Sequence, residues 1–118
     1  MSKNKKLKKI KEILLKYKSL LEKDGFPVRS LILYGSYAWG NFKSYSDIDV
    51  CVISDKLLKN KDYYETYLWK KVLEVDPRIE PVGYHPKDFK DIDPLVNEIK
   101  KEGIVIKWIH KEKETIWK

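Results

Sequence analysis

The stretch "GSYAWGNFKSYSDID", Gly35 to Asp49, lies between two apolar runs and decides how this chain is organised. It begins with a glycine–serine pair directly after the run 31–34 and ends with two aspartates at the start of the run 48–53. The apolar runs predict two strands, and the segment between them is too long for a tight hairpin. It has room for one short helix that starts at Ser36, followed by a polar loop.

The two aspartates are unusual because carboxylates pack poorly in strands and are costly to desolvate. Side chains alternate along a strand, so Asp47 and Asp49 are expected on one face, with Ile48 and Val50 on the other. Two carboxylates with a shared orientation can converge on a divalent cation. Magnesium fits this pattern because it binds through one or two carboxylates together with substrate phosphates.

The glycine–serine turn supplies the complementary chemistry. The amides of Gly35 and Ser36 and the Ser36 hydroxyl would offer hydrogen-bond donors at the start of a helical turn, which suits an anionic phosphate. Phosphate donors and metal-binding carboxylates on adjacent strand ends would form a site for a magnesium–triphosphate. The alternative is that Ser36 is an ordinary helix cap and Asp47 a strand-end residue paired with a lysine.

Hydrophobic periodicity extends this pattern to the rest of the chain. The expected helices cover 5–23, 62–75 and part of 86–101, and the expected strands cover 29–34, 48–54, 78–84 and 104–109. Gly25 is expected to stop the first helix. The helix at 62–75 is expected to turn one face inward, made of Tyr63, Tyr67, Leu68, Val72 and Leu73. Pro81 lies inside the third strand, which predicts an edge strand or a bulge. The fold class is therefore α/β or α+β, a small mixed β-sheet flanked by helices, and we expect a single domain over 1–118.

Composition and charge indicate which partners and which cell compartment suit this chain. The chain has 118 residues and a net charge of +7, and residues 3–23 hold nine lysines but only two glutamates. That segment could attract RNA, nucleotides or an acidic partner, or could simply be a solvated helix face. No run approaches the roughly 20 apolar residues of a membrane span. The single cysteine, Cys51, is expected to pack in the core, and we expect a cytoplasmic protein. His85 and His110 stand alone, and each is interpreted as a surface or structural histidine and not as a ligand.

At these residues the sequence resembles the minimal nucleotidyltransferases, small members of the DNA polymerase beta-like superfamily. Their signature is Gly-Ser, ten residues, then Asp-x-Asp, and residues 35–49 match it at full spacing. The resemblance implies a third carboxylate on a neighbouring strand. Glu80 is the leading candidate, with Glu74 and Asp76 as rivals at a helix end.

The resemblance also implies the activity. Such an enzyme moves a nucleoside monophosphate, here AMP from ATP, from a nucleoside triphosphate to a hydroxyl and releases pyrophosphate. Asp47, Asp49 and Glu80 would hold two Mg²⁺ ions, and Gly35 and Ser36 would bind the phosphates. Minimal nucleotidyltransferases commonly act as antitoxins beside a helical HEPN-type partner, which implies such a partner here.

Two alternatives remain open. The protein could restrain its partner by contact without catalysis, or it could be a transferase that acts on RNA or an aminoglycoside. The sequence does not specify the nucleotide base, the acceptor, or whether the chain forms a homo-oligomer. Four tryptophans offer contact surfaces or core packing: Trp39, Trp69, Trp108 and Trp117.

Overall fold

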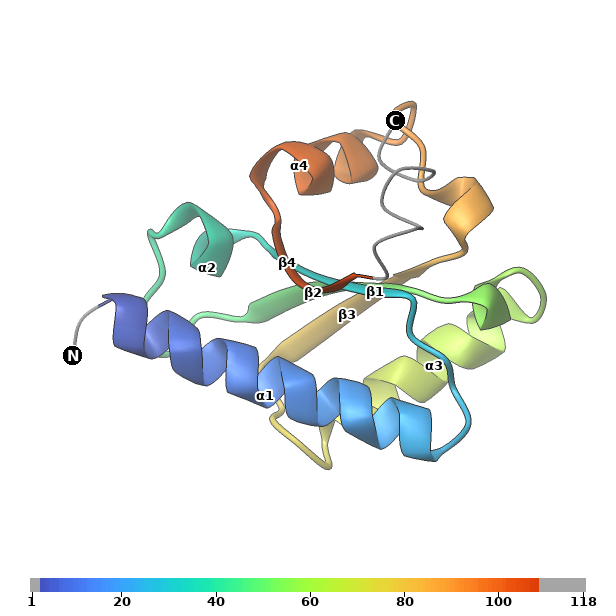
Figure 1. Cartoon of the computed structure of the whole chain (residues 1–118), viewed down its shortest axis with the longest axis horizontal. Helices are drawn as coiled ribbons and strands as arrows, with labels where there is room; N and C mark the ends of the chain where they lie inside the picture. Colours follow the sequence, from blue (N-terminus) through green and yellow to red (C-terminus); the bar gives the residue numbers. More distant parts are fainter. Residues whose placement is uncertain (1–2, 109–118) are drawn as a thin grey trace.

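A computed structural model describes residues 3–108 as a four-stranded sheet with helices on both faces (Figure 1). The elements, in chain order, are α1 (Lys3–Lys23), β1 (Ser30–Tyr34), α2 (Ser36–Trp39), β2 (Ile48–Ile53), a 3₁₀ turn (Asp55–Leu57), α3 (Lys61–Val72), β3 (Ile79–Tyr84), a second 3₁₀ turn (Pro86–Asp88), α4 (Pro94–Glu102) and β4 (Ile104–Trp108). The predicted α/β class, the four strands and the short helix at Ser36 are confirmed.

The strand order is β3-β2-β1-β4. β1 pairs antiparallel with both β2 and β4, whereas β2 and β3 are parallel, so the sheet is mixed as predicted. β3 lies at an edge, which confirms the prediction made from Pro81. An edge strand tolerates proline because one side of the strand has no neighbour that needs its missing N–H.

The two faces of the sheet carry separate cores. α1 and α3 cover one face, and α4 covers the other (Figure 1). Strand alternation divides β2 between them: Val50 and Val52 pack toward α1 and α3, whereas Cys51 and Ile53 pack toward α4. Cys51 is fully buried, as predicted, and burial raises the pKa of its thiol.

The first helix is amphipathic and stays amphipathic along its whole length. Its inward residues are Ile10, Leu14, Tyr17 and Leu21, all buried. The helix ends before Gly25, whose φ of +84° confirms the predicted glycine stop. None of the helices among the described residues has the length and apolar character needed to cross a bilayer.

The structure corrects the predicted inward face of the helix at 62–75. Tyr63 and Leu73, both expected to face inward, are 69% and 74% exposed, whereas Leu68 and Val72 are buried. Tyr64 of α3 packs on Phe26 instead. Neighbouring helical positions differ by about 100° around the axis, so a shift of one position changes the buried residue.

Two further predictions concern single residues. His85 is buried and its Nδ1 accepts a hydrogen bond from the Lys87 amide at 3.0 Å, which confirms a structural role. Trp39 and Trp69 are 52% and 47% exposed, so both lie at the surface. The predictions for Ile109, His110 and Trp117 lie outside the described residues.

Candidate active site

A pocket of about 560 Å³ opens at the ends of β1 and β2, on the face of the sheet that α4 covers. The glycine–serine turn and both aspartates of the Asp-x-Asp motif contribute to its wall. The complete lining is Tyr34, Gly35, Ser36, Trp39, Tyr45, Ser46, Asp47, Asp49 and Glu98. Four of the five residues predicted for the site therefore meet in one pocket.

Gly35 has the backbone that the turn requires. Its φ of +75° and ψ of −152° lie in a region that is essentially restricted to glycine. Its carbonyl accepts hydrogen bonds from the amides of Ala38 and Trp39, both at 3.0 Å, which closes α2 directly behind the turn. A Cβ at position 35 would overlap the carboxylate of Asp49. Glycine at this position thus allows the carboxylate to lie against the turn.

The two aspartates differ in their environments. β2 begins at Ile48, so Asp47 precedes the strand and is exposed, whereas Asp49 is half-buried within it. Burial raises the pKa of Asp49, and the negative charges of Asp47 and Glu98 raise it further. Because both aspartates line the pocket, the predicted shared orientation is confirmed.

Glu80 lies beside them on the next strand. The parallel register of β2 and β3 pairs Asp49 with Glu80. The pKa of Glu80 is raised to about 7, because its carboxyl shares a hydrogen bond with that of Asp47, is partly desolvated, and faces the charges of Asp47 and Asp49. A carboxylate cluster of this kind is electrostatically unfavourable without a cation.

The rival carboxylates have other partners. Glu74 pairs with Lys71 at 3.0 Å, and Asp76 pairs with Arg78 at 2.8 Å. The hydrogen bonds from Arg78 hold the pKa of Asp76 below its ordinary value. Of the three candidates from the sequence, only Glu80 is placed next to the aspartates, although its role as a ligand is still a prediction.

Within residues 3–108, no three acidic, histidine or cysteine side chains stand ready as a metal-binding set. A preformed set of three ligands is therefore not present around Asp47, Asp49 and Glu80. Magnesium does not require one, since it keeps several waters and usually binds one or two carboxylates plus phosphates. The pocket residues suit that mode because Asp47 and Asp49 line the same pocket as Gly35 and Ser36 of the turn.

The structure adds Glu98, Tyr34 and Tyr45 to the site, which the sequence analysis missed. Glu98 comes from α4, and its charge raises the pKa values of Asp49 and Tyr34. Tyr45 is 77% exposed at the mouth of the pocket. No motif links Glu98 to the aspartates, since it joins them only through the packing of α4 on the sheet.

Comparison with known proteins agrees with this geometry. Residues 7–106 match the family described as "Nucleotidyltransferase domain". Two relatives come from Methanocaldococcus jannaschii. "Putative protein adenylyltransferase MJ1215" is 38% identical over 78 residues, which cover 66% of this chain and 79% of the relative. "Putative protein adenylyltransferase MJ1379" is 45% identical over 64 residues, which cover 54% of this chain and 61% of the relative.

Solved structures share the fold at low sequence identity. One, described as a toxin-antitoxin with AMP-PNP, has a TM-score of 0.65 and 21% identity, and the match covers 91% of this chain and 80% of the other. Another is a tri-AMPylated Shewanella oneidensis HEPN toxin in complex with MNT antitoxin, with a TM-score of 0.62 and 18% identity over 94% of this chain and 80% of the other. At such identities the likeness establishes the fold.

Proposed function

The chain belongs to the nucleotidyltransferase domain family, and from this premise we propose that it transfers AMP from ATP to a hydroxyl group of a protein partner. The observation that carries the proposal is the meeting of the Gly35–Ser36 turn with Asp47 and Asp49 in one pocket. The relatives named as protein adenylyltransferases support a protein acceptor. The fold shared with an MNT antitoxin complex supports a HEPN-type toxin as that partner. Since ATP is the substrate, we place the reaction in the cytoplasm.

We propose that Mg²⁺ binds at Asp47 and Asp49, with Glu80 as the third carboxylate. Burial and the charges of Asp47 and Glu98 raise the pKa of Asp49. A hydrogen bond with Asp47, partial burial and the charges of both aspartates raise the pKa of Glu80. A cation at this point would relieve the repulsion among these carboxylates. When bound, a pair of such ions supplies charge stabilisation for the entering and leaving oxygens of the phosphoryl group.

The residues of the chain have separate tasks in this reaction. Gly35 and Ser36 bind the β- and γ-phosphates of ATP and orient the α-phosphate toward the acceptor. The acceptor oxygen forms a bond to the α-phosphorus, the bond from that phosphorus to the bridging oxygen breaks, and pyrophosphate leaves. Glu80 takes the proton of the acceptor hydroxyl.

The test uses ATP labelled at the α-phosphate, Mg²⁺ and a purified HEPN-type protein. Label that stays on the HEPN-type protein after denaturation supports the proposal. Asp49→Asn should remove the label, whereas the matched control Asp88→Asn, an exposed aspartate outside the pocket, should keep it. Tight association of the two proteins without label would support restraint by contact and would contradict the proposal.

A further inference from the structure

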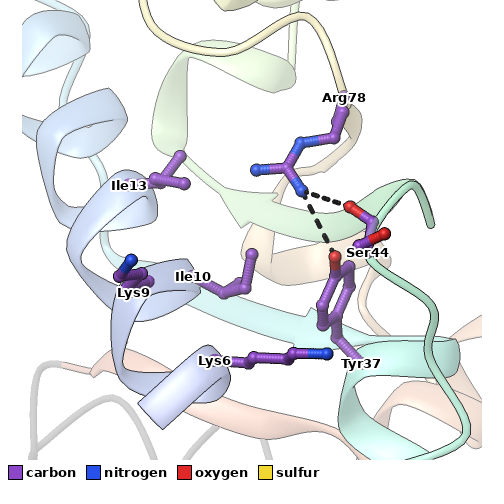
Figure 2. A pocket seen from close by; sticks show the side chains of 7 residues that line it. All are labelled: Lys6, Lys9, Ile10, Ile13, Tyr37, Ser44 and Arg78. Atoms are coloured by element: carbon purple, nitrogen blue, oxygen red, sulfur yellow. Dashed lines mark hydrogen bonds between the residues drawn. The ribbon is translucent and has the colours of Figure 1, made fainter. Parts of the chain in front are cut away.

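A second cavity, of about 310 Å³, lies between the first half of α1 and the segment that follows β1 (Figure 2). Ile10 and Ile13 of α1 and the ring of Tyr37 form its apolar wall, and Lys6 and Lys9 stand on its α1 side. The ring of Tyr37 is stacked on Phe42 at 4.5 Å, so the wall is held rigid from behind. The result is an apolar hollow with a cationic rim.

Arg78 completes the rim from the start of β3. It pairs with Asp76 and donates hydrogen bonds to the Tyr37 hydroxyl at 3.3 Å and to the Ser44 carbonyl at 3.2 Å (Figure 2). These bonds tie the loop around Ser44 to α2. A ligand in the cavity would therefore contact the same segment that carries the candidate active site, but from the opposite side.

Arg78 is paired with Asp76, but the charges of the two lysines at the cavity are not balanced by the protein. Neither Lys6 nor Lys9 pairs with an acidic side chain in the described part of the chain. The whole excess of positive charge lies in the segment 3–23, which forms α1. The apolar face of α1 is already packed on the sheet, so it is not available to a membrane or to a protein groove. What α1 offers to a ligand is cationic charge beside one apolar hollow.

On the face of the sheet that α4 covers, the candidate active site is acidic and not basic. The candidate active site contains Asp47, Asp49 and Glu98, and among residues 3–108 no lysine or arginine lines it. As long as no cation neutralises these carboxylates, a polyanion would be repelled from that pocket and attracted to α1. The structure thus separates an acidic reaction pocket from a basic surface on the other face.

We propose that the α1 cavity binds single-stranded RNA, with one base in the apolar hollow and the neighbouring phosphates on Lys6 and Lys9. The hydroxyl of Ser44 and the guanidinium of Arg78 offer polar contacts to the edge of the base. This RNA is a bound ligand and not the acceptor, because the reaction pocket faces the other way.

The test is fluorescence anisotropy with labelled 12-nucleotide U and A strands, without ATP. The charge-reversed double variant Lys6→Glu/Lys9→Glu removes the rim, and Lys16→Glu/Lys23→Glu makes the same charge change on exposed lysines of the same helix away from the cavity. We expect the first pair to lose at least tenfold in affinity and the second less than threefold. The slope of log K against log salt should fall by about 1.4 for the first pair, since two phosphate contacts contribute about 0.7 each.

A second pair of variants tests the hollow itself. Ser44→Glu places a carboxylate at the cavity, whereas Ser19→Glu places one on an exposed position of α1 that does not line it. Only Ser44→Glu should weaken RNA binding, by at least fivefold. Both substitutions are at exposed positions, so both variants should keep the fold. Equal losses of RNA affinity in the two members of either pair would overturn the proposal, as would an absence of RNA binding. Poly-glutamate that competes for the site as well as RNA does would also overturn it, because that result would indicate an acidic protein partner. Asp49→Asn should bind RNA like the wild type, so this test is independent of the proposed transfer reaction.

Discussion

The contact between Gly35 and Asp49 makes the substitution Gly35→Ala a sensitive test of the site. An alanine at φ +75° and ψ −152° costs about 1–3 kcal/mol of backbone strain. The new Cβ would also overlap the Asp49 carboxylate, which must then rotate away from the turn. We therefore expect a loss of stability and at least a tenfold loss in affinity for Mg·ATP, about 1.4 kcal/mol or more.

Gly25→Ala is the matched control. Gly25 also has a positive φ, +84°, but a Cβ there meets nothing within 4 Å. This variant should lose only the left-handed backbone preference, about 1–2 kcal/mol, and should bind Mg·ATP normally. Urea unfolding gives the free energy of unfolding of each variant, and isothermal titration calorimetry gives the affinity for Mg·ATP.

A double-mutant cycle separates the backbone strain of Gly35→Ala from the overlap of its new Cβ with the Asp49 carboxylate. Asp49→Ala removes the carboxylate atoms that the new Cβ would meet, so Gly35→Ala should cost less stability in that background, with a coupling of about 0.5–3 kcal/mol. The reasoning is refuted if Gly35→Ala and Gly25→Ala lose the same stability, both keep their affinity for Mg·ATP, and the cycle shows no coupling.

Three further predictions follow from the same geometry. Asp49→Asn should lower the rate of AMP transfer at least 100-fold, about 2.7 kcal/mol, with an unchanged circular dichroism spectrum; full activity with Mg²⁺ would contradict the assignment. Glu80 has a pKa raised from 4.5 to about 7, so the folded metal-free protein retains a proton that the unfolded chain releases. The free energy of unfolding should therefore fall as the pH rises from 4.5 to 7, and Glu80→Gln should flatten this dependence in urea titrations at several pH values; an equal slope in both proteins would count against the raised pKa. Tyr17→Phe removes a buried hydrogen bond to the Leu68 carbonyl, 2.8 Å long, and should lower the free energy of unfolding by about 1 kcal/mol without changing Mg·ATP affinity; a change in that affinity would show that the bond between α1 and α3 also supports the site.

Several features of this protein could be inferred from the chain alone because they depend on neighbours in the sequence. The spacing from Gly35 to Asp49, the alternation that turns Asp47 and Asp49 to one side, and the edge position of the strand with Pro81 are all local. Backbone geometry sets each of them over a few residues, and tertiary packing did not override them.

The local sequence pattern was not enough to predict which face of the helix at 61–72 packs on the core. Its apolar and aromatic residues almost encircle the helix axis, so the sequence left more than one face available to the core. Packing against Phe26 selected Tyr64 and left Tyr63 and Leu73 in solvent. Contact with the rest of the protein, and not helical propensity, decided the orientation.

The third carboxylate and the two-sided charge distribution required the folded structure. The sequence favoured Glu80 over Glu74 and Asp76 as the third carboxylate, but only the parallel register of β2 and β3 pairs Glu80 with Asp49. Glu98 reaches the same pocket only because α4 packs over that face of the sheet. The lysines of α1 could be identified from the sequence, but their position on the face of the sheet opposite the candidate active site could not. Distances between residues far apart in the chain are set by sheet order and layer packing, which no short motif encodes.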